Sequence, residues 1–580
     1  MLLIGEWCHL RARKESWSRL DAEVAPYHWD DRAKLFADYK YLQGLHERLL
    51  SDLASQLNGI HCTDHGKRYW RTVLGPWLGY FIQMLFDRWE SIKQVTQAYE
   101  LSGTVVLTGQ EDAMVPGDMS GLLRLFCTDE WNHLLYARIL QMYTAVPYET
   151  RECGSVFRSS SLVPVAESWK SRAKQTLANW YCRTANHLVR DQDCFFLGTG
   201  LPVWDEIRLC GRFGQVPQWW RAQAPARTAV DWDRRQWKVV GNNETEFEDC
   251  ARTLIPQQIP TSYLEGYGQL SKFVSELPWP KRPKLIWTNN SFNANDVFKV
   301  WAAEKAEQGA AVVVGQHGGL YGVGRWLFNE DHEVAISDRY LSWGWSDQDQ
   351  PKVTPVGQLS AKHPLGVRHE QQPGALLVTG IVPRQSYWMF SFLIARQWLD
   401  YFSDQCAFVQ HLPLHIREAL TVRLHSRDYG WSVASRWAER FPNLRLDAGR
   451  SDIYDLMGQS RLYIATYNAT TYLESFTMDV PTIIFWNPYY WELRDSAIPY
   501  FDELERVGIF HSSPESAARH VAAIWNDVGA WWNSALVRDV LDRFKMRYCH
   551  LPDHLLDRVE DTLRDIMVSK ADQTGAAAKC

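Results

Sequence analysis

The sequence predicts an α/β protein with two Rossmann-like domains in one chain of 580 residues. Short β-branched runs alternate with amphipathic helical stretches from about residue 283 onward, which is the pattern of parallel sheets. Several of these runs end in polar or glycine-rich loops, and open α/β sheets bind ligands at such loops. The length also exceeds what one hydrophobic core usually serves, so we expect two or three domains.

The composition is that of a folded, soluble protein. Apolar residues make up 46% and charged residues 22%, which excludes a disordered or collagenous chain. The net charge is −6, and Lys and Arg are scattered, so we expect no nucleic acid as a partner. The eleven cysteines include no CxxC pair and predict reduced thiols rather than a zinc site or a disulfide framework.

No segment predicts a signal peptide or a membrane span. The apolar start within Met1–Trp7 is too short for a signal-peptide core. The apolar stretch Thr72–Phe86 falls short of the roughly 20 residues that cross a bilayer. We predict a buried helix there with Pro76 in its first turn, and a membrane-docking face is the alternative. The protein is therefore expected in the cytoplasm, with peripheral contact at the cytoplasmic face of the membrane left open.

The N-terminal half begins with a predicted strand at Leu2–Gly5. Leucines at steps of three and four predict a helix over residues 31–58. Val105–Thr108 predicts a strand and Asp129–Met142 an amphipathic helix. The stretch 150–280 is rich in Trp, Arg and Pro and predicts a helical or irregular insertion.

A βαβ pattern follows, with a strand at Lys284–Thr288, a helix at Asp296–Gln308 and a buried strand at Ala310–Gly315. A polar, proline-bearing boundary lies within residues 345–373. Four further strands are predicted at Ala375–Thr379, Thr421–Leu424, Leu462–Ala465 and Thr482–Trp486. Five helices accompany them at Trp388–Phe402, Ser432–Arg440, Thr471–Met478, Glu515–Trp525 and Asp539–Arg547.

These elements predict three parts of the chain. Residues 1–345 form an N-terminal α/β domain, which includes the insertion at about 150–280. Residues 346–565 form a C-terminal α/β domain. Residues 566–580 form a disordered tail.

The strongest candidate site is the string Gln316-His317-Gly318-Gly319 at the end of a buried strand. Glycines let a backbone approach a ligand closely. A histidine at such a position can donate to a phosphate or act as a general base. We therefore predict His317 as catalytic and Gln316, Gly318 and Gly319 as substrate-binding. The alternative is a tight turn with a histidine bonded inside the protein.

Polar residues after the preceding strand are expected at the same sheet edge. Asn289, Asn290 and Ser291 are predicted to bind substrate there. Asp296 and Glu330 are the candidate carboxylate partners of the histidine, and Asp296 is preferred because it follows the adjacent strand directly.

The C-terminal half carries two weaker candidates for nucleotide binding. Arg423, His425 and Arg427 follow a predicted strand, and guanidinium groups suit phosphate recognition. A surface salt-bridge cluster with Asp428 is the alternative explanation.

The second of these candidates is the string TYNATTYLES at 466–475. It places Thr470 and Thr471 near a helix N-terminus, where free N–H groups attract anions. Glu474 lies one turn further and could accept hydrogen bonds from ribose hydroxyls.

We expect neither a metal nor another cofactor. His332-Glu333 lacks the second histidine of an HExxH site, and three DxD strings do not follow a clear strand. No P-loop, dinucleotide-binding GxGxxG, nucleophile elbow or kinase pattern is present in the sequence.

Five strings resemble a family of bacterial transferases encoded with surface-polysaccharide genes. They are LLIGEWC (2–8), YHWDDRAKL (27–35), YWRTVLGPWL (69–78), VGQHGGLYG (314–322) with HEVAISDRYLSWGW (332–345) and RDYGWS (427–432). The resemblance implies a GT-B-like pair of Rossmann-type domains acting on a nucleotide-activated sugar. The QHG string is also similar to capsule glycosyltransferases that use CMP-ulosonic acids and to teichoic-acid-type polymerases.

The resemblance implies a metal-independent glycosyltransferase with a nucleotide-sugar donor and a surface-polysaccharide or lipid-linked acceptor. It implies that residues 1–345 carry acceptor binding and catalysis and that residues 346–565 bind the donor nucleotide. In such a site Arg, His and helix N-termini stabilise the leaving group. Two alternatives stay open. One is a polyol-phosphate transferase or nucleotide-sugar epimerase of similar fold, and the other is a non-catalytic assembly protein.

Overall fold

The computed structural model describes residues 1–153, 181, 184–220, 222, 225–360 and 374–577. Contacts divide the chain into two compact, interleaved units. The first unit comprises Met1–Phe36, Gln316–Glu330 and Leu341–Leu555. The second unit comprises Ala37–Gly315, Asp331–Tyr340 and Leu556–Cys580. The division into domains at residue 345 stays a prediction.

The first unit is built on a six-stranded parallel sheet of order β12-β11-β10-β13-β14-β15. Its strands are β10 (Ala375–Val378), β11 (Leu420–Arg423), β12 (Arg445–Asp447), β13 (Leu462–Ala465), β14 (Thr482–Phe485) and β15 (Phe510–His511). Numbered along the chain, this order is 3-2-1-4-5-6, which is the Rossmann arrangement. The strand order reverses between β10 and β13, and ligands of such sheets bind outside the carboxyl ends of the strands at that point.

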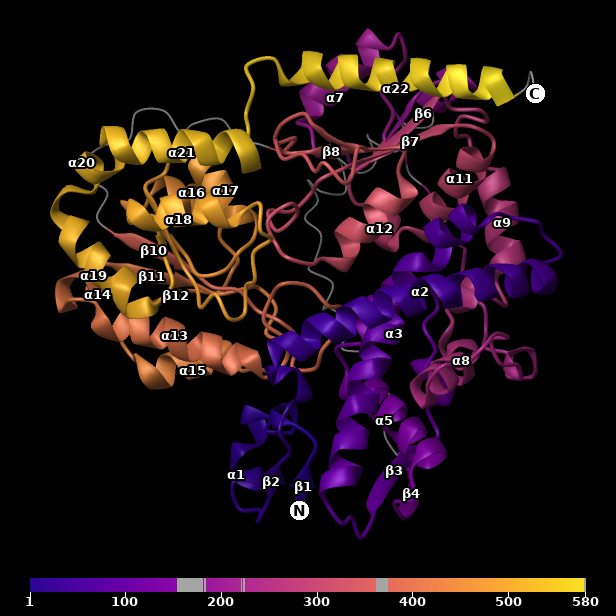
Figure 1. Cartoon of the computed structure of the whole chain (residues 1–580), viewed down its shortest axis with the longest axis horizontal. Helices are drawn as coiled ribbons and strands as arrows, with labels where there is room; N and C mark the ends of the chain where they lie inside the picture. Colours follow the sequence, from indigo (N-terminus) through magenta and orange to yellow (C-terminus); the bar gives the residue numbers. More distant parts are fainter. Residues whose placement is uncertain (154–180, 182–183, 221, 223–224, 361–373, 578–580) are drawn as a thin grey trace. The chain divides into compact units, whose positions relative to one another are not determined.

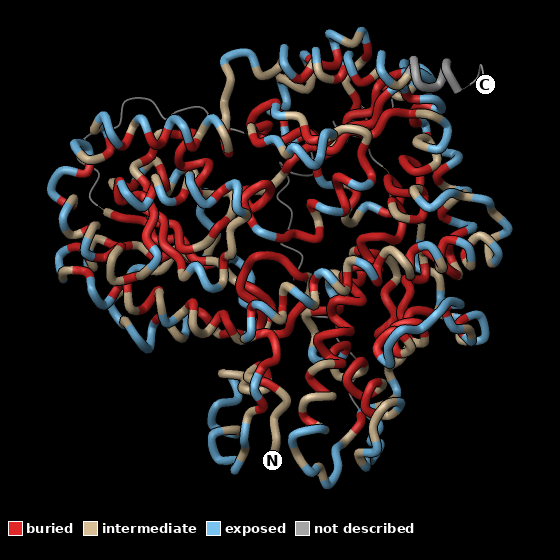
Figure 2. The backbone as a smooth tube through the Cα atoms, viewed as in Figure 1, coloured by how far each residue is buried: buried red, intermediate tan, exposed pale blue. Residues whose placement is uncertain are grey.

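Helices cover both faces of this sheet (Figure 1). One face carries α13 (Gln397–His411), α15 (Val433–Arg440) and α19 (Pro514–Ile524). The other carries α17 (Thr470–Thr477), α18 (Ile498–Arg506) and α21 (Ala535–Tyr548). The unit also contains α14 (Leu414–Glu418), α16 (Ile453–Gly458) and α20 (Val528–Trp532). Figure 2 shows the central strands buried between these layers.

The N-terminal segment belongs to the first unit. It contains β1 (Leu2–Leu3), α1 (Lys14–Trp17) and β2 (Glu23–Val24). At its end Arg32 donates from Nε and Nη2 to the two carboxylate oxygens of Glu492, each at 2.7 Å. Arg32 also donates from Nη1 to Gln397 Oε1 at 3.0 Å. The first residues of the chain are therefore fixed by residues that follow more than 350 positions later.

The second unit is mainly helical around a second parallel sheet. Strands β5 (Phe195–Phe196), β6 (Leu285–Thr288) and β7 (Ala311–Gly315) pair in register. In the strand order, β7 is followed by β8 (Arg339–Ser342) and β9 (Val353–Pro355), although β9 and the last two residues of β8 count with the first unit. The long helices are α2 (Arg32–His61), α3 (Lys67–Ala98), α5 (Asp129–Tyr143), α8 (Glu246–Gln258), α11 (Asp296–Glu307) and α22 (Leu555–Ala577).

The shorter elements complete this part of the chain. Helices are α4 (Met119–Leu125), α7 (Val203–Arg212), α9 (Tyr267–Ser275), α10 (Ser291–Ala294) and α12 (Phe328–Ile336). Strands β3 (Thr104–Thr108) and β4 (Tyr148–Glu152) form a two-stranded parallel sheet. The α/β class with two Rossmann-like parallel sheets is confirmed.

Several expected elements differ from those observed. Pro76 lies in the tenth position of α3, not in its first turn. The helix is buried on nearly every side from Tyr69 to Trp89, and this burial outweighs the cost of about 3 kcal/mol for an interior proline. The strand at Leu2–Gly5 is only two residues long and pairs with β2, outside both large sheets. The region 150–280 supplies β5, a strand of the second sheet.

The prediction of a disordered tail from residue 566 is wrong, because α22 continues to Ala577. Val559, Leu563 and Ile566 are buried at steps of three and four. This apolar stripe anchors the helix.

Candidate functional site

The loop Gln316–Trp326, here called the glycine loop, follows β7 and belongs to the first unit. Gln316 is buried and fixes its start. Its Oε1 accepts from the N–H of Trp343 at 2.9 Å and from Nε1 of Trp345 at 2.8 Å. Its Nε2 donates to the carbonyl of Gly318 at 2.8 Å. These contacts give Gln316 a positioning role. Its contact with substrate remains a prediction from the sequence.

The middle of the loop lies against the N-terminus of α17. The N–H of Gly319 donates to Thr470 Oγ1 at 3.1 Å. A Cβ at residue 319 would lie 2.5 Å from the carbonyl oxygen of Ala469 and 2.9 Å from Leu473 Cδ1. Only glycine permits this approach, so two strings that the sequence singled out 150 residues apart meet in the first unit.

A partly buried ion pair fixes the second half of the loop. Glu330 accepts from the N–H of Gly322 at 2.7 Å through Oε2, and from Nη2 of Arg494 at 2.7 Å through Oε1. The Arg494 guanidinium lies 5.4 Å from the centre of the Trp345 ring. Gly322 has a φ of 73°, and a Cβ there would lie 2.5 Å from the same ring. Sequence reasoning missed Arg494 and Trp345.

The loop that follows β10 holds the end of the glycine loop. The N–H of Trp326 donates to Ser391 Oγ at 2.9 Å, and the N–H of Ser391 donates back to the carbonyl of Trp326 at 2.9 Å. Gly324 forms an antiparallel bridge with Leu493, which follows β14. Segments that follow β10, β13 and β14 therefore surround the glycine loop at the carboxyl edge of the sheet.

His317 lies beside the close approach of Gly319 to α17. Its Nε2 is 3.1 Å from the hydroxyl of Tyr321, and the two ring centres are 4.9 Å apart. The residue is partly exposed, whereas Gln316 is 1% exposed. The loop thus fixes the backbone around a histidine that solvent reaches.

The start of α17 offers hydrogen-bond donors at the switch point. Ala469 precedes the helix and provides no side-chain cap. Asn468 is 1% exposed, and its Oδ1 accepts from the hydroxyl of Tyr472 at 3.1 Å. Its Nδ2 has no hydrogen-bond partner in the described part of the chain. A buried amide donor without a partner is costly, and a bound anion would relieve that cost.

The predicted nucleotide contacts near α17 differ in accessibility. Thr470 faces the glycine loop, as described above. Thr471 accepts from the hydroxyl of Tyr463 at 2.8 Å, and Glu474 accepts from the hydroxyl of Tyr454 at 2.9 Å. Burial, with the Glu474 charge and hydrogen bond, raises the pKa of Tyr454. Glu474 is 7% exposed, which leaves little of it open to a ligand.

The β11 candidates follow the neighbouring strand. Arg423 forms an ion pair with Asp447 at 2.8 Å, so its guanidinium is held inside the unit. His425 and Arg427 are exposed, and His425 Nδ1 accepts from the N–H of Arg427 at 3.0 Å. Partial burial and the positive charges of Arg427 and Arg423 lower the pKa of His425.

Asn289, Asn290 and Ser291 belong to the second unit and follow β6. Asn289 is buried and accepts from Nε1 of Trp287 at 3.1 Å. Asn290 is exposed, and the N–H of Ser291 donates to Thr288 Oγ1 at 3.1 Å. Their substrate contacts stay predictions.

Asp296 also belongs to the second unit, where it lies in a buried polar cluster. Its Oδ1 accepts from the hydroxyl of Tyr263 at 2.7 Å and pairs with Nζ of Lys299 at 2.7 Å. Its Oδ2 accepts from the N–H of Met119 at 3.0 Å and from Ser262 Oγ at 3.3 Å. Burial lowers the pKa of Lys299, which has no exposed surface. Four groups thus donate to this carboxylate. A catalytic role for Asp296 remains a prediction from the sequence.

A family model for LIC12162 family transferases matches residues 1–563 of the chain. This chain belongs to that transferase family. The resemblance to a transferase family found in the sequence is thereby confirmed. No curated protein matches the sequence.

Solved structures resemble this transferase less closely than the family model does. The wall teichoic acid polymerase TagF is 10% identical with a TM-score of 0.29, over 69% of this chain and 95% of the other. MurG of Acinetobacter baumannii is 12% identical with a TM-score of 0.33, over 64% and 99%. A UDP-N-acetylglucosamine 2-epimerase of Listeria monocytogenes is 12% identical with a TM-score of 0.33, over 55% and 85%. Likeness at this level does not assign a function.

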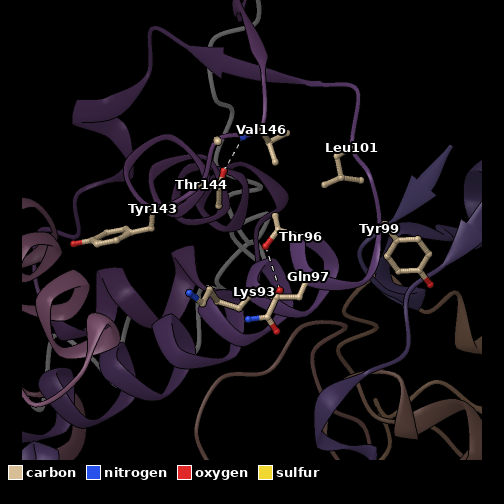
Figure 3. A pocket seen from close by; sticks show the side chains of 9 residues that line it. Lys93, Thr96, Gln97, Tyr99, Leu101, Tyr143, Thr144 and Val146 are labelled. Atoms are coloured by element: carbon tan, nitrogen blue, oxygen red, sulfur yellow. Dashed lines mark hydrogen bonds between the residues drawn. The ribbon is translucent and has the colours of Figure 1, made fainter.

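The transferase also has a surface pocket in its second unit, with a volume of about 280 Å³ (Figure 3). Lys93 and Tyr143 line it, and both are bonded to acidic residues of α8, Glu246 and Asp249. None of the predicted site residues lines this pocket.

No group of three or more His, Cys, Asp or Glu side chains among the described residues could hold a metal ion. None of the described helices combines the length and apolar character that a membrane span requires.

Proposed function

We propose that this family member is a glycosyltransferase that moves a sugar from a nucleotide-activated donor to a surface-polysaccharide or lipid-linked acceptor. One observation carries the proposal: the glycine loop with His317 is surrounded by segments that follow β10, β13 and β14. Strands β10 and β13 flank the switch point, where a Rossmann sheet binds its ligand, and β14 lies next to β13. A candidate base and an anion-binding helix start thus lie in one unit.

In this proposal the first unit supplies both the base and the nucleotide contacts. The N–H groups at the start of α17, with the Asn468 amide, bind the phosphate next to the bond that breaks. His317 accepts the proton of the acceptor hydroxyl, whose oxygen bonds to the anomeric carbon. The nucleotide leaves with the electron pair of the broken bond. Glu330 and Arg494 position the glycine loop.

In the same proposal, residues 346–565 bind the donor and residues 1–345 bind the acceptor. CMP-ulosonic acids are candidate donors. The enzyme works in the cytoplasm, with peripheral contact to the membrane where lipid-linked acceptors are presented.

The test is a donor screen on the full chain. Thermal shift with CMP, CDP, UDP and GDP should show one preferred nucleotide, because a ligand at 100 times its Kd stabilises by about 2.7 kcal/mol. Product analysis with the matching activated sugars should show transfer. His317→Ala should reduce transfer at least a hundredfold, and His415→Ala, an exposed histidine on α14, is the matched control.

The alternatives predict other results. An epimerase would convert the nucleotide sugar without an acceptor, and a polyol-phosphate transferase would respond to CDP-polyols. An assembly protein would show no nucleotide response. Activity of His317→Ala within a few-fold of the parent protein would remove His317 from the mechanism.

A further inference from the structure

The hydroxyl of Tyr321 lies next to the candidate base of the glycine loop. Its oxygen is 3.1 Å from Nε2 of His317. The other ring nitrogen of His317, Nδ1, is buried, whereas the contact at Nε2 is only partly buried. A general base must come within hydrogen-bond reach of the proton that it takes. Nε2 is therefore the nitrogen that takes the proton, and Tyr321 already contacts it.

The backbone around Tyr321 is held in a tight turn. The carbonyl of Leu320 accepts from the N–H of Val323 at 3.1 Å and from that of Gly324 at 2.8 Å. The Tyr321 ring lies against the loop itself, since a Cβ at Gly318 would be 3.1 Å from its Cε2. The side chain is 5% exposed. The hydroxyl is thus preorganised beside the imidazole, because packing fixes the ring that carries it.

The two carboxylates that the sequence offered as partners of His317 are engaged by other groups. Asp296 accepts from four donors of the second unit. Glu330 accepts from Arg494 and from a loop N–H. The hydroxyl of Tyr321 thus takes the place at the imidazole that the sequence assigned to a carboxylate.

The histidine and the tyrosine lie beside the proposed phosphate site. They flank the two glycines of the loop, and the N–H of Gly319 donates to Thr470 Oγ1 at 3.1 Å. Thr470 is the first residue of α17, whose N–H groups bind the phosphate in the proposed function. Base, hydroxyl and phosphate site therefore belong to one connected set of contacts in the first unit.

We infer that Tyr321 passes the proton of the acceptor hydroxyl to His317. The inference rests on the proposed function. As the acceptor oxygen bonds to the anomeric carbon, its proton moves to the oxygen of Tyr321, and the hydroxyl proton of Tyr321 moves to Nε2 of His317. The nucleotide leaves with the electron pair of the bond between the anomeric carbon and the phosphate oxygen. Tyr321 is neutral before and after the step, and His317 ends as an imidazolium that returns its proton to water.

A tyrosine hydroxyl suits this role because it donates one hydrogen bond and accepts another at the same time. Direct transfer to Nε2 would require the acceptor to displace the Tyr321 hydroxyl, and the fixed turn opposes that displacement. The inference makes Tyr321 a catalytic residue, since it contacts the acceptor hydroxyl. Sequence reasoning passed over it, because nothing local distinguishes it from a tyrosine that only packs in the core.

The first test is Tyr321→Phe in the full chain, which removes the hydroxyl and keeps the ring. The kcat for transfer should fall about a hundredfold or more, as expected for the loss of an acid–base group. The nucleotide-induced thermal shift should not change, because the phosphate contacts at α17 remain. The matched control is Tyr548→Phe, at a buried tyrosine of the same unit whose hydroxyl donates to the carbonyl of Ser496 at 3.3 Å. This control should keep the parent kcat.

The second test separates proton transfer from positioning. Difluorotyrosine in place of Tyr321 keeps the hydroxyl and the ring but makes the hydroxyl more acidic. The single-turnover rate of transfer should then be lost at a lower pH than in the parent protein, because an ionised hydroxyl has no proton to give to His317. A residue that only positions the histidine would leave the pH profile unchanged.

Two results would overturn the inference. One is a kcat of Tyr321→Phe within a few-fold of the parent value or no lower than that of Tyr548→Phe. The other is the same pH profile with and without fluorine. Absence of transfer by the parent protein contradicts the proposed function itself, on which the proton relay depends, so the two failures are distinguishable.

Discussion

Asp296 and Glu330 are both buried carboxylates that the sequence offered as partners of His317, yet their surroundings differ. Asp296 accepts from four groups, and one of them is the fully buried Lys299. Glu330 accepts from one loop N–H and from Arg494. The first arrangement joins helices of the second unit, and the second fixes a loop of the first unit. The number of hydrogen-bond donors, and the elements that supply them, thus distinguish a carboxylate that joins helices from one that positions a loop.

Replacement of Asp296 by Asn should have the largest effect on stability. It leaves the Lys299 ammonium buried without its counter-charge, which typically costs about 3–5 kcal/mol. Urea unfolding measures the loss. The double variant Asp296→Asn/Lys299→Met should recover part of it, because the unpaired charge is gone. If the four donors show that Asp296 has only a structural role, any folded Asp296→Asn protein should retain near-parent kcat. A hundredfold fall in kcat would support the catalytic role that the sequence predicts for Asp296.

Gly319→Ala should have the next largest effect, and it falls on the glycine loop of the first unit. The new Cβ would press on Ala469 and Leu473, and overpacking of this kind costs about 1–3 kcal/mol. Because it separates the glycine loop from α17, transfer should fall by about tenfold or more beyond the stability loss. Gly268→Ala on α9 is the control, since nothing lies within 4 Å of its Cβ. Full activity of Gly319→Ala would show that the close approach is dispensable.

Glu330→Gln should cost about 1–2 kcal/mol, because it weakens hydrogen bonds to a charged partner. A double-mutant cycle with Arg494→Gln should show coupling in both stability and kcat. KM for the donor should change less than kcat, since the pair positions His317 and not the nucleotide. Additive effects on kcat would contradict this positioning role.

The smallest effect is expected at Asp404, a half-buried carboxyl of α13. Burial and the nearby charges of Asp400 and Glu515 raise its pKa from 3.8 to about 6. The folded state therefore holds its proton more tightly, so this group lowers stability as pH rises from about 4 to 6, and the loss persists above 6. Asp404→Asn should stabilise the protein at pH 7 by about 1 kcal/mol after solvent screening, and should change little at pH 4. An equal gain at both pH values would exclude titration as the cause.

The sequence predicted those parts of the fold that have strong local patterns. Ala311–Gly315 and Leu462–Ala465 are β-branched or apolar runs that end in polar loops, and both are strands. Strand β15 has two residues, too few to show a period, and it was missed. Pro76 was misplaced because burial of α3, which exists only in the folded protein, decides where that helix begins.

The sequence predicted which short strings belong to the candidate site, but not which residues contact one another there. His317 and Thr470 stood out because each follows a strand in a distinctive loop, and the structure brings their loops together. The bond between Glu330 and Arg494 joins residues 164 positions apart, and nothing local marks Arg494 as its partner. Long-range pairs of this kind arise from the folded topology and have no signature in sequence spacing.

The interleaving of the two units has a consequence for how the chain is made. During synthesis Arg32 leaves the ribosome several hundred residues before Gln397 and Glu492, the groups that fix it. Residues 1–36 must therefore wait until Glu492 has been made, whereas Ala37–Gly315, most of the second unit, is made earlier and can begin to fold. Residues 1–36 are thus synthesised long before Gln397 and Glu492, and their fixation by these groups is a late step of folding.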